Sequence, residues 1–280
     1  MKKISRRSFL AAAGLTVAAL ALTACGGSAS TASSAAASSV AASSEAASTS
    51  AAAAELTTVE AGKLTMATNA TFPPYEMTTD SGEIEGIDVD TAKAIAEKLG
   101  LELQIDDMEF DAALLSVQQG KADIVMAGVT VTDERKAVMD FSDSYATGIQ
   151  SIIVPNDSDI ASPDDLAGKT IGTQRGTTGY IYCSDDFGDE NVVAYDDGLT
   201  AVQALNNGQV DAVVIDNAPA QEFVAANPGL KVLDTSYAEE DYAIGMAKGS
   251  ALEDAVNKAL EELKADGTLQ AIVDKYINAN

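Results

Sequence analysis

The feature that most constrains the fold is an internal quasi-repeat. The segments 114–125 (LLSVQQGKADIV) and 202–213 (VQALNNGQVDAV) both have the pattern of a helix, a glycine stop, an aspartate and a buried strand. The strand-like run 63–68 (KLTMAT) is likewise echoed by 169–173 (KTIGT). The alternative is chance recurrence of a common helix-to-strand turn. The repeat predicts two lobes of similar topology.

Strand and helix patterns alternate along the globular part of the chain. Apolar residues at helical spacing predict helices over 88–99 and 111–119, and the segments 101–105 and 122–127 have strand patterns. Strands separated by helices imply βαβ units and largely parallel sheets, so the fold class is α/β. Because ligands bind at the carboxyl ends of parallel strands, we expect a small-molecule site where the two lobes face each other.

Charge and composition narrow the function. The 280 residues carry a net charge of −26, which argues against a nucleic-acid partner because phosphate binding needs clustered Lys and Arg. The chain contains no His, which removes the commonest general base and the commonest metal ligand. We therefore expect a binding protein, not an enzyme, with no metal or other cofactor.

The N-terminus has the pattern of an export signal. A charged start and an apolar stretch indicate a signal peptide over residues 1–24. Residues 22–25 (LTAC) resemble the lipobox of bacterial lipoproteins, which implies a lipid anchor on Cys25, and the Ala/Ser-rich remainder of 25–55 indicates a flexible linker. Residues 5–10 (SRRSFL) also resemble a twin-arginine signal, and the export route stays open. With Cys25 lipidated, Cys183 is expected to be a buried core thiol.

Several motifs carry a resemblance to a known family. Their segments are 67–76 (ATNATFPPYE), 86–90 (GIDVD), 127–135 (AGVTVTDER), 140–142 (DFS), 211–217 (DAVVIDN) and 266–269 (DGTL). In this order, and over about residues 60–280, they resemble the polar amino-acid family of bacterial extracytoplasmic solute-binding proteins. The resemblance implies a two-lobed periplasmic-binding-protein-like fold of type II, in which two αβ lobes joined by two hinge strands trap an amino acid.

The resemblance also sets the expected lobe limits. Lobe 1 is expected to comprise residues 56–145 plus 247–280, and lobe 2 residues 150–240. The hinge strands are expected near 145–151 and 241–247. Ligand binding should close the lobes, because hinge residues absorb the backbone change.

The family pattern assigns the ligand α-carboxylate to Arg135. A planar guanidinium matches both carboxylate oxygens, and amides and hydroxyls of Thr130, Thr177 and Thr178 would complete the shell. On the residues alone, a surface arginine within the charged run 133–136 (DERK) is the favoured interpretation of Arg135. The α-carboxylate site is thus an implication of the resemblance.

The remaining site residues follow from the same resemblance. Asp216, with the Gly128 carbonyl, is expected to accept the ligand α-ammonium, although Asp216 also suits a helix N-cap. Phe72 and Phe110 resemble the aromatic walls around the ligand side chain, with ordinary core packing as the alternative.

Ligand selectivity should rest on Asn69, Gln174 and Ile215. Family members that take cationic ligands often have an acidic residue where this chain has Asn69, and an amide offers no charge to offset a desolvated cation. We therefore expect a neutral polar amino acid, while Glu76 leaves a basic ligand open.

These inferences give one main hypothesis and two alternatives. The main hypothesis is a monomeric extracytoplasmic protein, lipid-anchored to the cell membrane, that binds a free L-amino acid and delivers it to an ABC transporter permease. The first alternative is an exported enzyme on the same fold, such as a cyclohexadienyl dehydratase-like protein, because fold does not decide function. The second is a sensor module that acts through another protein.

Overall fold

A computed structural model describes residues 56–277 of the chain. The predicted signal peptide, Cys25 and the predicted linker lie outside the described residues. Within residues 56–277, no helix has both the length and the apolar character needed to cross a membrane.

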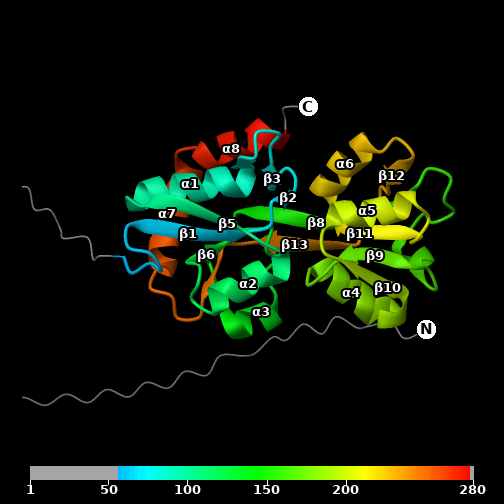
Figure 1. Cartoon of the computed structure of the whole chain (residues 1–280), viewed down its shortest axis with the longest axis horizontal. Helices are drawn as coiled ribbons and strands as arrows, with labels where there is room; N and C mark the ends of the chain where they lie inside the picture. The colour runs from blue at the N-terminus through cyan, green and yellow to red at the C-terminus, as the bar shows by residue number, and fades with distance from the viewer. Residues whose placement is uncertain (1–55, 278–280) are drawn as a thin grey trace, which may run out of the picture. The chain divides into compact units, whose positions relative to one another are not determined.

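The first sheet has five strands in the order β5-β1-β6-β14-β7. Figure 1 labels β1, β5 and β6 of this sheet. Its strands are β1 (Lys63–Thr68), β5 (Glu102–Asp107), β6 (Ile124–Val125), β7 (Met139–Phe141) and β14 (Gly245–Ala247). Its helices are α1 (Ile87–Leu99), α2 (Phe110–Gln118), α3 (Asp133–Val138), α7 (Glu253–Ala265) and α8 (Thr268–Ile277). Strand β1 lies parallel to β5 and β6, whereas β14 runs antiparallel to β6 and β7.

The second sheet has six strands, with β10-β9-β11-β8-β12 in order and β13 also paired with β8. Its strands are β8 (Ala146–Pro155), β9 (Ile171–Gln174), β10 (Val192–Tyr195), β11 (Ala212–Asp216), β12 (Leu230–Val232) and β13 (Ala238–Tyr242). Its helices are α4 (Thr178–Phe187), α5 (Gly198–Asn206) and α6 (Asn217–Ala226), with short 3-10 turns at Pro163–Leu166 and Asp189–Asn191. A third, small sheet joins β2 (Thr71–Phe72), β3 (Glu76–Thr78) and β4 (Ile84–Glu85).

The α/β class and the two-lobed arrangement agree with the sequence, but the sheets are mixed and not largely parallel as expected. The parallel part of each sheet comes from the repeated units, as in β9 beside β10 and β11. The antiparallel part comes from β14 in the first sheet and from β8, β12 and β13 in the second. Three of these strands, β8, β13 and β14, are next to the two passages of the chain between the sheets, and their reversal of direction makes antiparallel pairs.

Side-chain alternation along central strands builds a core on both faces of each sheet. In β11, Val213 and Ile215 pack with helices α5 and α6, whereas Ala212 and Val214 pack on the other face, with Cys183 of α4. Cys183 is buried and free, as the sequence predicted. Each large aliphatic side chain buried in this way stabilises the fold by about 1.5–3 kcal/mol.

The quasi-repeat is a true structural equivalence. The carboxylate of Asp123 accepts a hydrogen bond from the Thr65 amide at 2.7 Å, and that of Asp211 accepts one from the Thr170 amide at 2.8 Å. The backbone amides of the two aspartates donate in return to the carbonyls of the same two threonines, at 2.9 and 2.8 Å. Each aspartate therefore fixes the start of one central strand, and the two halves can be aligned through these pairs.

Two chain segments connect the sheets. Residues 142–145 pass from β7 to β8, and residues 243–244 pass from β13 to β14. The two connections are hydrogen-bonded to each other, with the Tyr145 amide donating to the Tyr242 carbonyl and the Ser142 amide donating to the Ile244 carbonyl, both at 2.9 Å. They overlap the expected hinge ranges 145–151 and 241–247. The lobe limits given above stay predictions, because residues 56–277 all fall in one compact unit.

Helix ends follow local sequence signals. Helix α1 ends at Gly100, which adopts the left-handed conformation (φ 71°) that glycine tolerates best. Helices α3, α4 and α5 begin at side-chain caps from Thr132, Thr177 and Asp197. The predicted strand 122–127 is shorter in the structure, because only Ile124 and Val125 pair with both neighbours.

Candidate functional site

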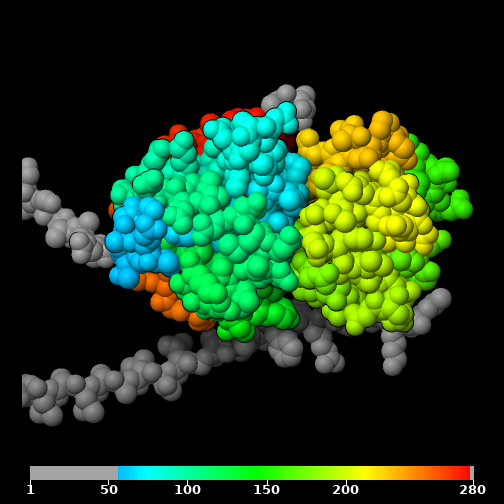
Figure 2. All heavy atoms as spheres, in the orientation of Figure 1, coloured from blue at the N-terminus to red at the C-terminus, as the bar shows by residue number. Residues whose placement is uncertain are grey.

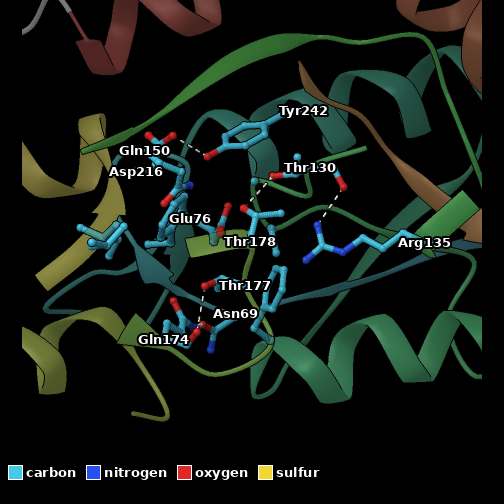
Figure 3. Close-up of a pocket in the computed structure, with 16 residues that line it drawn as sticks. Asn69, Glu76, Thr130, Arg135, Gln150, Gln174, Thr177, Thr178, Asp216 and Tyr242 are labelled. Atoms are coloured by element: carbon cyan, nitrogen blue, oxygen red, sulfur yellow. Dashed lines mark hydrogen bonds between the residues drawn. The ribbon is translucent and has the colours of Figure 1, made fainter. Parts of the chain in front are cut away.

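All of the predicted ligand-binding residues line one pocket (Figure 3). The pocket encloses about 450 Å³ of space between atoms, part of it continuous with solvent. Residues from both sheets contribute to it, and Figure 2 shows the two groups of atoms meeting along one boundary. The predicted residues that it brings together are Asn69, Phe72, Phe110, Gly128, Thr130, Arg135, Gln174, Thr177, Thr178 and Asp216.

Arg135 is a buried cation held by backbone carbonyls. Its Nη1 donates to the Thr130 carbonyl at 2.8 Å and its Nη2 to the Gly176 carbonyl at 3.2 Å, while the guanidinium lies 5.4 Å from the centre of the Phe110 ring. The Arg135 amide also donates to the capping hydroxyl of Thr132, which fixes the first turn of α3. Burial lowers the pKa of Arg135 from its ordinary value. None of the ion pairs among residues 56–277 involves Arg135, although the charge of the buried Glu240 carboxylate acts to raise its pKa.

The threonine hydroxyls are engaged differently from the sequence-based expectation. Thr130 and Thr178 both donate their hydroxyl protons to Oε2 of Glu240, at 3.1 and 3.0 Å, and Gln150 Nε2 donates to the same oxygen at 3.0 Å. The Thr177 hydroxyl donates to the Gln174 carbonyl. A hydroxyl has one proton to donate, so Thr130 and Thr178 offer a ligand carboxylate their backbone amides in preference to their hydroxyls. The Thr177 amide donates to the Gln174 carbonyl at 3.4 Å.

Asp216 has the helix N-cap role considered for it and also lines the pocket. Its Oδ1 accepts from the Ala218 amide at 3.1 Å and caps helix α6. Its Oδ2 accepts from the Tyr242 hydroxyl at 2.6 Å and from the Ile149 amide at 2.8 Å. Burial raises the pKa of Asp216 to about 6, although these three donors oppose the shift. Asp216 is therefore an ionisable group whose charged form gains from a cation in the pocket.

The amide of Asn69 is largely committed to other protein groups. Its Oδ1 accepts from Gln174 Nε2 at 2.8 Å and from the Thr71 hydroxyl at 3.0 Å, and its Nδ2 donates to the Met108 carbonyl at 3.0 Å. The contact between Asn69 and Gln174 joins residues at the ends of β1 and β9, which belong to different sheets. Asn69 thus helps to close the pocket.

Glu76 lies in the pocket lining with no exposed surface. Neither of its carboxyl oxygens accepts a hydrogen bond from an N–H or O–H group of the described residues. Burial raises the pKa of Glu76 well above its ordinary value, and the charge of the neighbouring Asp88 adds to the shift. An unpaired buried carboxyl in a ligand pocket favours a cationic partner.

The backbone conformation and the close packing at position 128 both require glycine. Its φ is 55°, and a Cβ atom there would lie 2.8 Å from Cε1 of Phe72 and 3.2 Å from Cε2 of Tyr242. The Phe72 ring also stacks on Tyr75, with centroids 5.7 Å apart. The aromatic wall predicted at Phe72 therefore closes directly over the Gly128 backbone.

Sequence reasoning missed two polar residues of the lining, Gln150 and Tyr242. Both fall inside the expected hinge ranges, but strand alternation alone does not say which face of a hinge strand meets the ligand. Ile215, expected to contribute to selectivity, lines the pocket. Ala127 and Val214 complete the lining.

The described residues contain no group of three or more His, Cys, Asp and Glu side chains placed to hold a metal ion. The chemistry of the pocket is that of a receptor with one buried cation, one capped carboxylate and one unpaired carboxyl. Arg135 and Asp216 lie on different sides of it in Figure 3.

Comparisons with known proteins place the chain in a family. Residues 64–279 match the model of the bacterial extracellular solute-binding proteins, family 3. The L-cystine-binding protein TcyJ of Escherichia coli (strain K12) is 33% identical over 225 residues, which cover 79% of this chain and 85% of that protein. The arginine-binding extracellular protein ArtP of Bacillus subtilis (strain 168) is 34% identical over 224 residues, which cover 76% and 86%.

Solved structures agree with these relatives. The arginine-, lysine-, histidine-binding protein ArtJ of Geobacillus stearothermophilus superposes with a TM-score of 0.74 at 35% identity, covering 78% of this chain and 96% of that one. An ancestral arginine-binding protein bound to glutamine gives a TM-score of 0.74 at 42% identity, covering 77% and 98%. The fold is therefore the expected two-lobed one of type II periplasmic binding proteins, and the chain belongs to the bacterial extracellular solute-binding proteins, family 3.

Proposed function

We propose that the protein binds a free L-amino acid outside the cytoplasm and delivers it to an ABC transporter permease. The observation that carries this proposal is Arg135, a buried guanidinium in the pocket that forms no ion pair within residues 56–277. Relatives named for binding cystine and arginine support the ligand class.

In this proposal the zwitterionic end of the ligand spans the pocket. The α-carboxylate pairs with the guanidinium of Arg135 and with the backbone amides of Thr130 and Thr178. The α-ammonium pairs with Asp216, whose charged form it stabilises, and with the Gly128 carbonyl. Phe72 and Phe110 enclose the apolar part of the ligand.

We infer that the ligand side chain is basic, with L-arginine as the first candidate. The expectation of a neutral ligand rested on Asn69, whose amide is instead bonded to Gln174, Thr71 and Met108. Glu76 supplies the carboxyl that Asn69 lacks, in the pocket and without a hydrogen-bonded donor from N–H or O–H groups of the described residues. Relatives that bind arginine are consistent with this ligand.

A neutral polar amino acid is the second candidate. The paired amides of Asn69 and Gln174 offer groups that could exchange partners with a ligand amide. The ancestral arginine-binding protein bound to glutamine shows that a related pocket accepts such a ligand.

A screen of L-amino acids by thermal shift tests the proposed function. The protein is unfolded and refolded to remove carried ligand, and then titrated. At a hundredfold excess over its dissociation constant, a ligand that binds the folded state alone adds about 2.7 kcal/mol of stability. A shift with arginine supports the first candidate, and one with glutamine alone supports the second. No shift with any amino acid would contradict the proposal and favour the dehydratase-like alternative, which turnover of a cyclohexadienyl substrate would establish.

The proposal also includes the localisation of the protein. We propose that lipid on Cys25 anchors the protein to the outer face of the cell membrane, and that it acts as a monomer without enzymatic activity. The Cys25→Ser variant should leave the membrane fraction and appear in the soluble extracytoplasmic fraction. The matched control is Cys183→Ser, since Cys183 is buried in the core and should not affect fractionation.

A further inference from the structure

Two carboxyl groups are buried side by side in the wall of the pocket. Glu76 of β3 and Asp88 of α1 have no exposed surface. The Asp88 amide donates to the carbonyl of Tyr75, the residue before Glu76, at 2.9 Å, and each carboxyl affects the pKa of the other. Asp88 Oδ2 accepts from the Tyr145 hydroxyl at 2.7 Å and from the Gly128 amide at 3.0 Å. We call Glu76 and Asp88 the carboxyl pair.

The carboxyl pair lacks donors for its other oxygens. Both oxygens of Glu76 and Oδ1 of Asp88 accept nothing from an N–H or O–H group of the described residues. Two neighbouring ionised carboxylates would repel each other strongly in a buried site shielded from solvent. A proton held between them removes the repulsion and supplies the missing hydrogen bond.

Neighbouring negative charge opposes ionisation of Glu76, although hydrogen bonds from the Tyr145 hydroxyl and the Gly128 amide act to lower the pKa of Asp88. Asp107 of β5 adds negative charge near Glu76, and the Tyr75 and Tyr145 hydroxyls keep their own protons because burial raises the pKa of each. The ion pairs among residues 56–277 include neither Glu76 nor Asp88. Burial raises the pKa of Glu76 well above its ordinary value and that of Asp88 to about 6.

We propose that Glu76 and Asp88 share one proton, and that a cationic ligand side chain arriving at Glu76 displaces this proton into solvent. The inference rests on the proposed function and deepens it, since it concerns what the same pocket does when a basic amino acid binds. A guanidinium keeps its own proton at any physiological pH, so a proton released on arginine binding must come from the protein. A neutral side chain brings no charge to replace the proton, which stays in place.

The shared proton makes ligand preference depend on pH. When binding releases one proton, the affinity rises about tenfold for each pH unit over the range in which the pair holds that proton. Asp216 also titrates near this range, but it faces the α-ammonium of every amino acid. The ratio of arginine affinity to glutamine affinity therefore isolates the carboxyl pair and should increase with pH.

Calorimetry in two buffers of different ionisation enthalpy counts the protons directly. At about pH 7.5, where Asp216 is already ionised, arginine binding to the full mature protein should release about one proton and glutamine binding about none. Asp88→Asn places an amide donor beside Glu76, so this variant should bind arginine without releasing a proton. Glu76→Gln should also release none and should lose the preference for arginine. Glu97→Gln, on the exposed face of α1, is the matched control and should behave as wild type.

The outcomes separate this inference from the proposed function. Arginine binding to the wild type without proton release overturns the shared proton and leaves the proposed function intact. If only neutral amino acids bind, the proposal of a basic ligand is wrong. NMR of the ¹³C-labelled Glu76 carboxyl then tests whether Glu76 shares a proton with Asp88. An ionised Glu76 signal at about pH 6 would then overturn the shared proton, and a protonated one would support it. The proton count for the wild-type protein tests the shared proton even if a variant fails to fold.

Discussion

Asn69 and Gln174 occupy equivalent positions in the two halves of the repeat, and they bond to each other across the pocket. Each stands four residues after the threonine, Thr65 or Thr170, that is tied to the repeat aspartate. Gln174 Nε2 donates to Asn69 Oδ1 at 2.8 Å. The carboxyl ends of β1 and β9, equivalent strands of the two repeated units, therefore meet at the pocket.

This contact predicts a role in holding the closed state. Gln174→Ala removes one neutral hydrogen bond between the sheets, which is worth about 0.5–1.5 kcal/mol. We expect amino-acid affinity to fall up to about tenfold, mainly through faster ligand dissociation, because the contact joins the two sheets across the pocket and opposes its opening. Stopped-flow measurement of both rates checks this expectation. Gln203→Ala, at an exposed position on α5, should change neither rate; a slower association with unchanged dissociation would contradict a closing role.

Arg135 should dominate binding. Arg135→Ala removes the cation proposed for the ligand α-carboxylate, and breaking a buried charged pair costs about 2–5 kcal/mol. We expect at least a thirtyfold loss of affinity for every amino acid that binds, measured by calorimetry. Arg135→Lys should recover only part of the lost affinity, since an ammonium cannot form a bidentate pair with both carboxylate oxygens. The matched control is Arg175→Ala, which removes a half-exposed arginine outside the pocket lining. Near-wild-type affinity in Arg135→Ala would remove the α-carboxylate assignment.

Asp216 should make binding weaken in acid. Burial raises its pKa to about 6. Below that pH the carboxyl becomes neutral and no longer attracts the α-ammonium. We expect affinity for all amino acid ligands to drop below about pH 6, approaching tenfold per pH unit. Titrations of wild type and Asp216→Asn across this range measure the effect, and the variant should bind weakly without this pH dependence.

The same group affects the stability of the free protein in the opposite sense. Because the folded pKa of about 6 lies above the ordinary value of 3.8, Asp216 contributes stability that is fully present below pH 3.8 and is lost as the pH rises through 6. As the pH rises from 3.8 to above 6, we expect the free energy of unfolding of wild type to decrease relative to that of Asp216→Asn. Urea unfolding at both ends of the window measures it, with Asp254→Asn on the exposed face of α7 as the control. A difference that is constant with pH would contradict the raised pKa.

Gly128 should tolerate no side chain. Gly128→Ala puts a Cβ 2.8 Å from the Phe72 ring and strains a backbone with φ 55°, and a left-handed non-glycine residue costs about 1–2 kcal/mol even in open space. We expect lower thermal stability together with weaker ligand binding, because Phe72 must move from the pocket wall. Gly229→Ala has open space and no positive φ, and it should change neither property. Unaltered binding in Gly128→Ala would show that the wall can adjust.

Much of the site could be predicted because the family motifs can be matched residue by residue. The strand patterns alone predict only that a site lies at the carboxyl ends of the strands. The resemblance supplies the individual residues, Asn69, Gln174, Asp216, Arg135 and Thr130, and the structure places all of them in one pocket.

The rest depends on contacts between segments far apart in the sequence. Glu240 takes the hydroxyl protons of Thr130 and Thr178, residues 110 and 62 positions away, and no local pattern indicates such a pairing. The commitment of the Asn69 amide to Gln174, 105 positions away, is equally invisible. The sequence therefore indicated a neutral ligand from the amide at position 69 and left a basic one open through Glu76, whose unpaired carboxyl lines the assembled pocket.

The most direct test of the account is a crystal structure of the refolded protein with the amino acid selected by the thermal-shift screen. The account predicts the ligand α-carboxylate within hydrogen-bond distance of both terminal nitrogens of Arg135, and its α-ammonium on Asp216. A ligand whose carboxylate lies away from Arg135, or that leaves Asp216 without a cation, would contradict it.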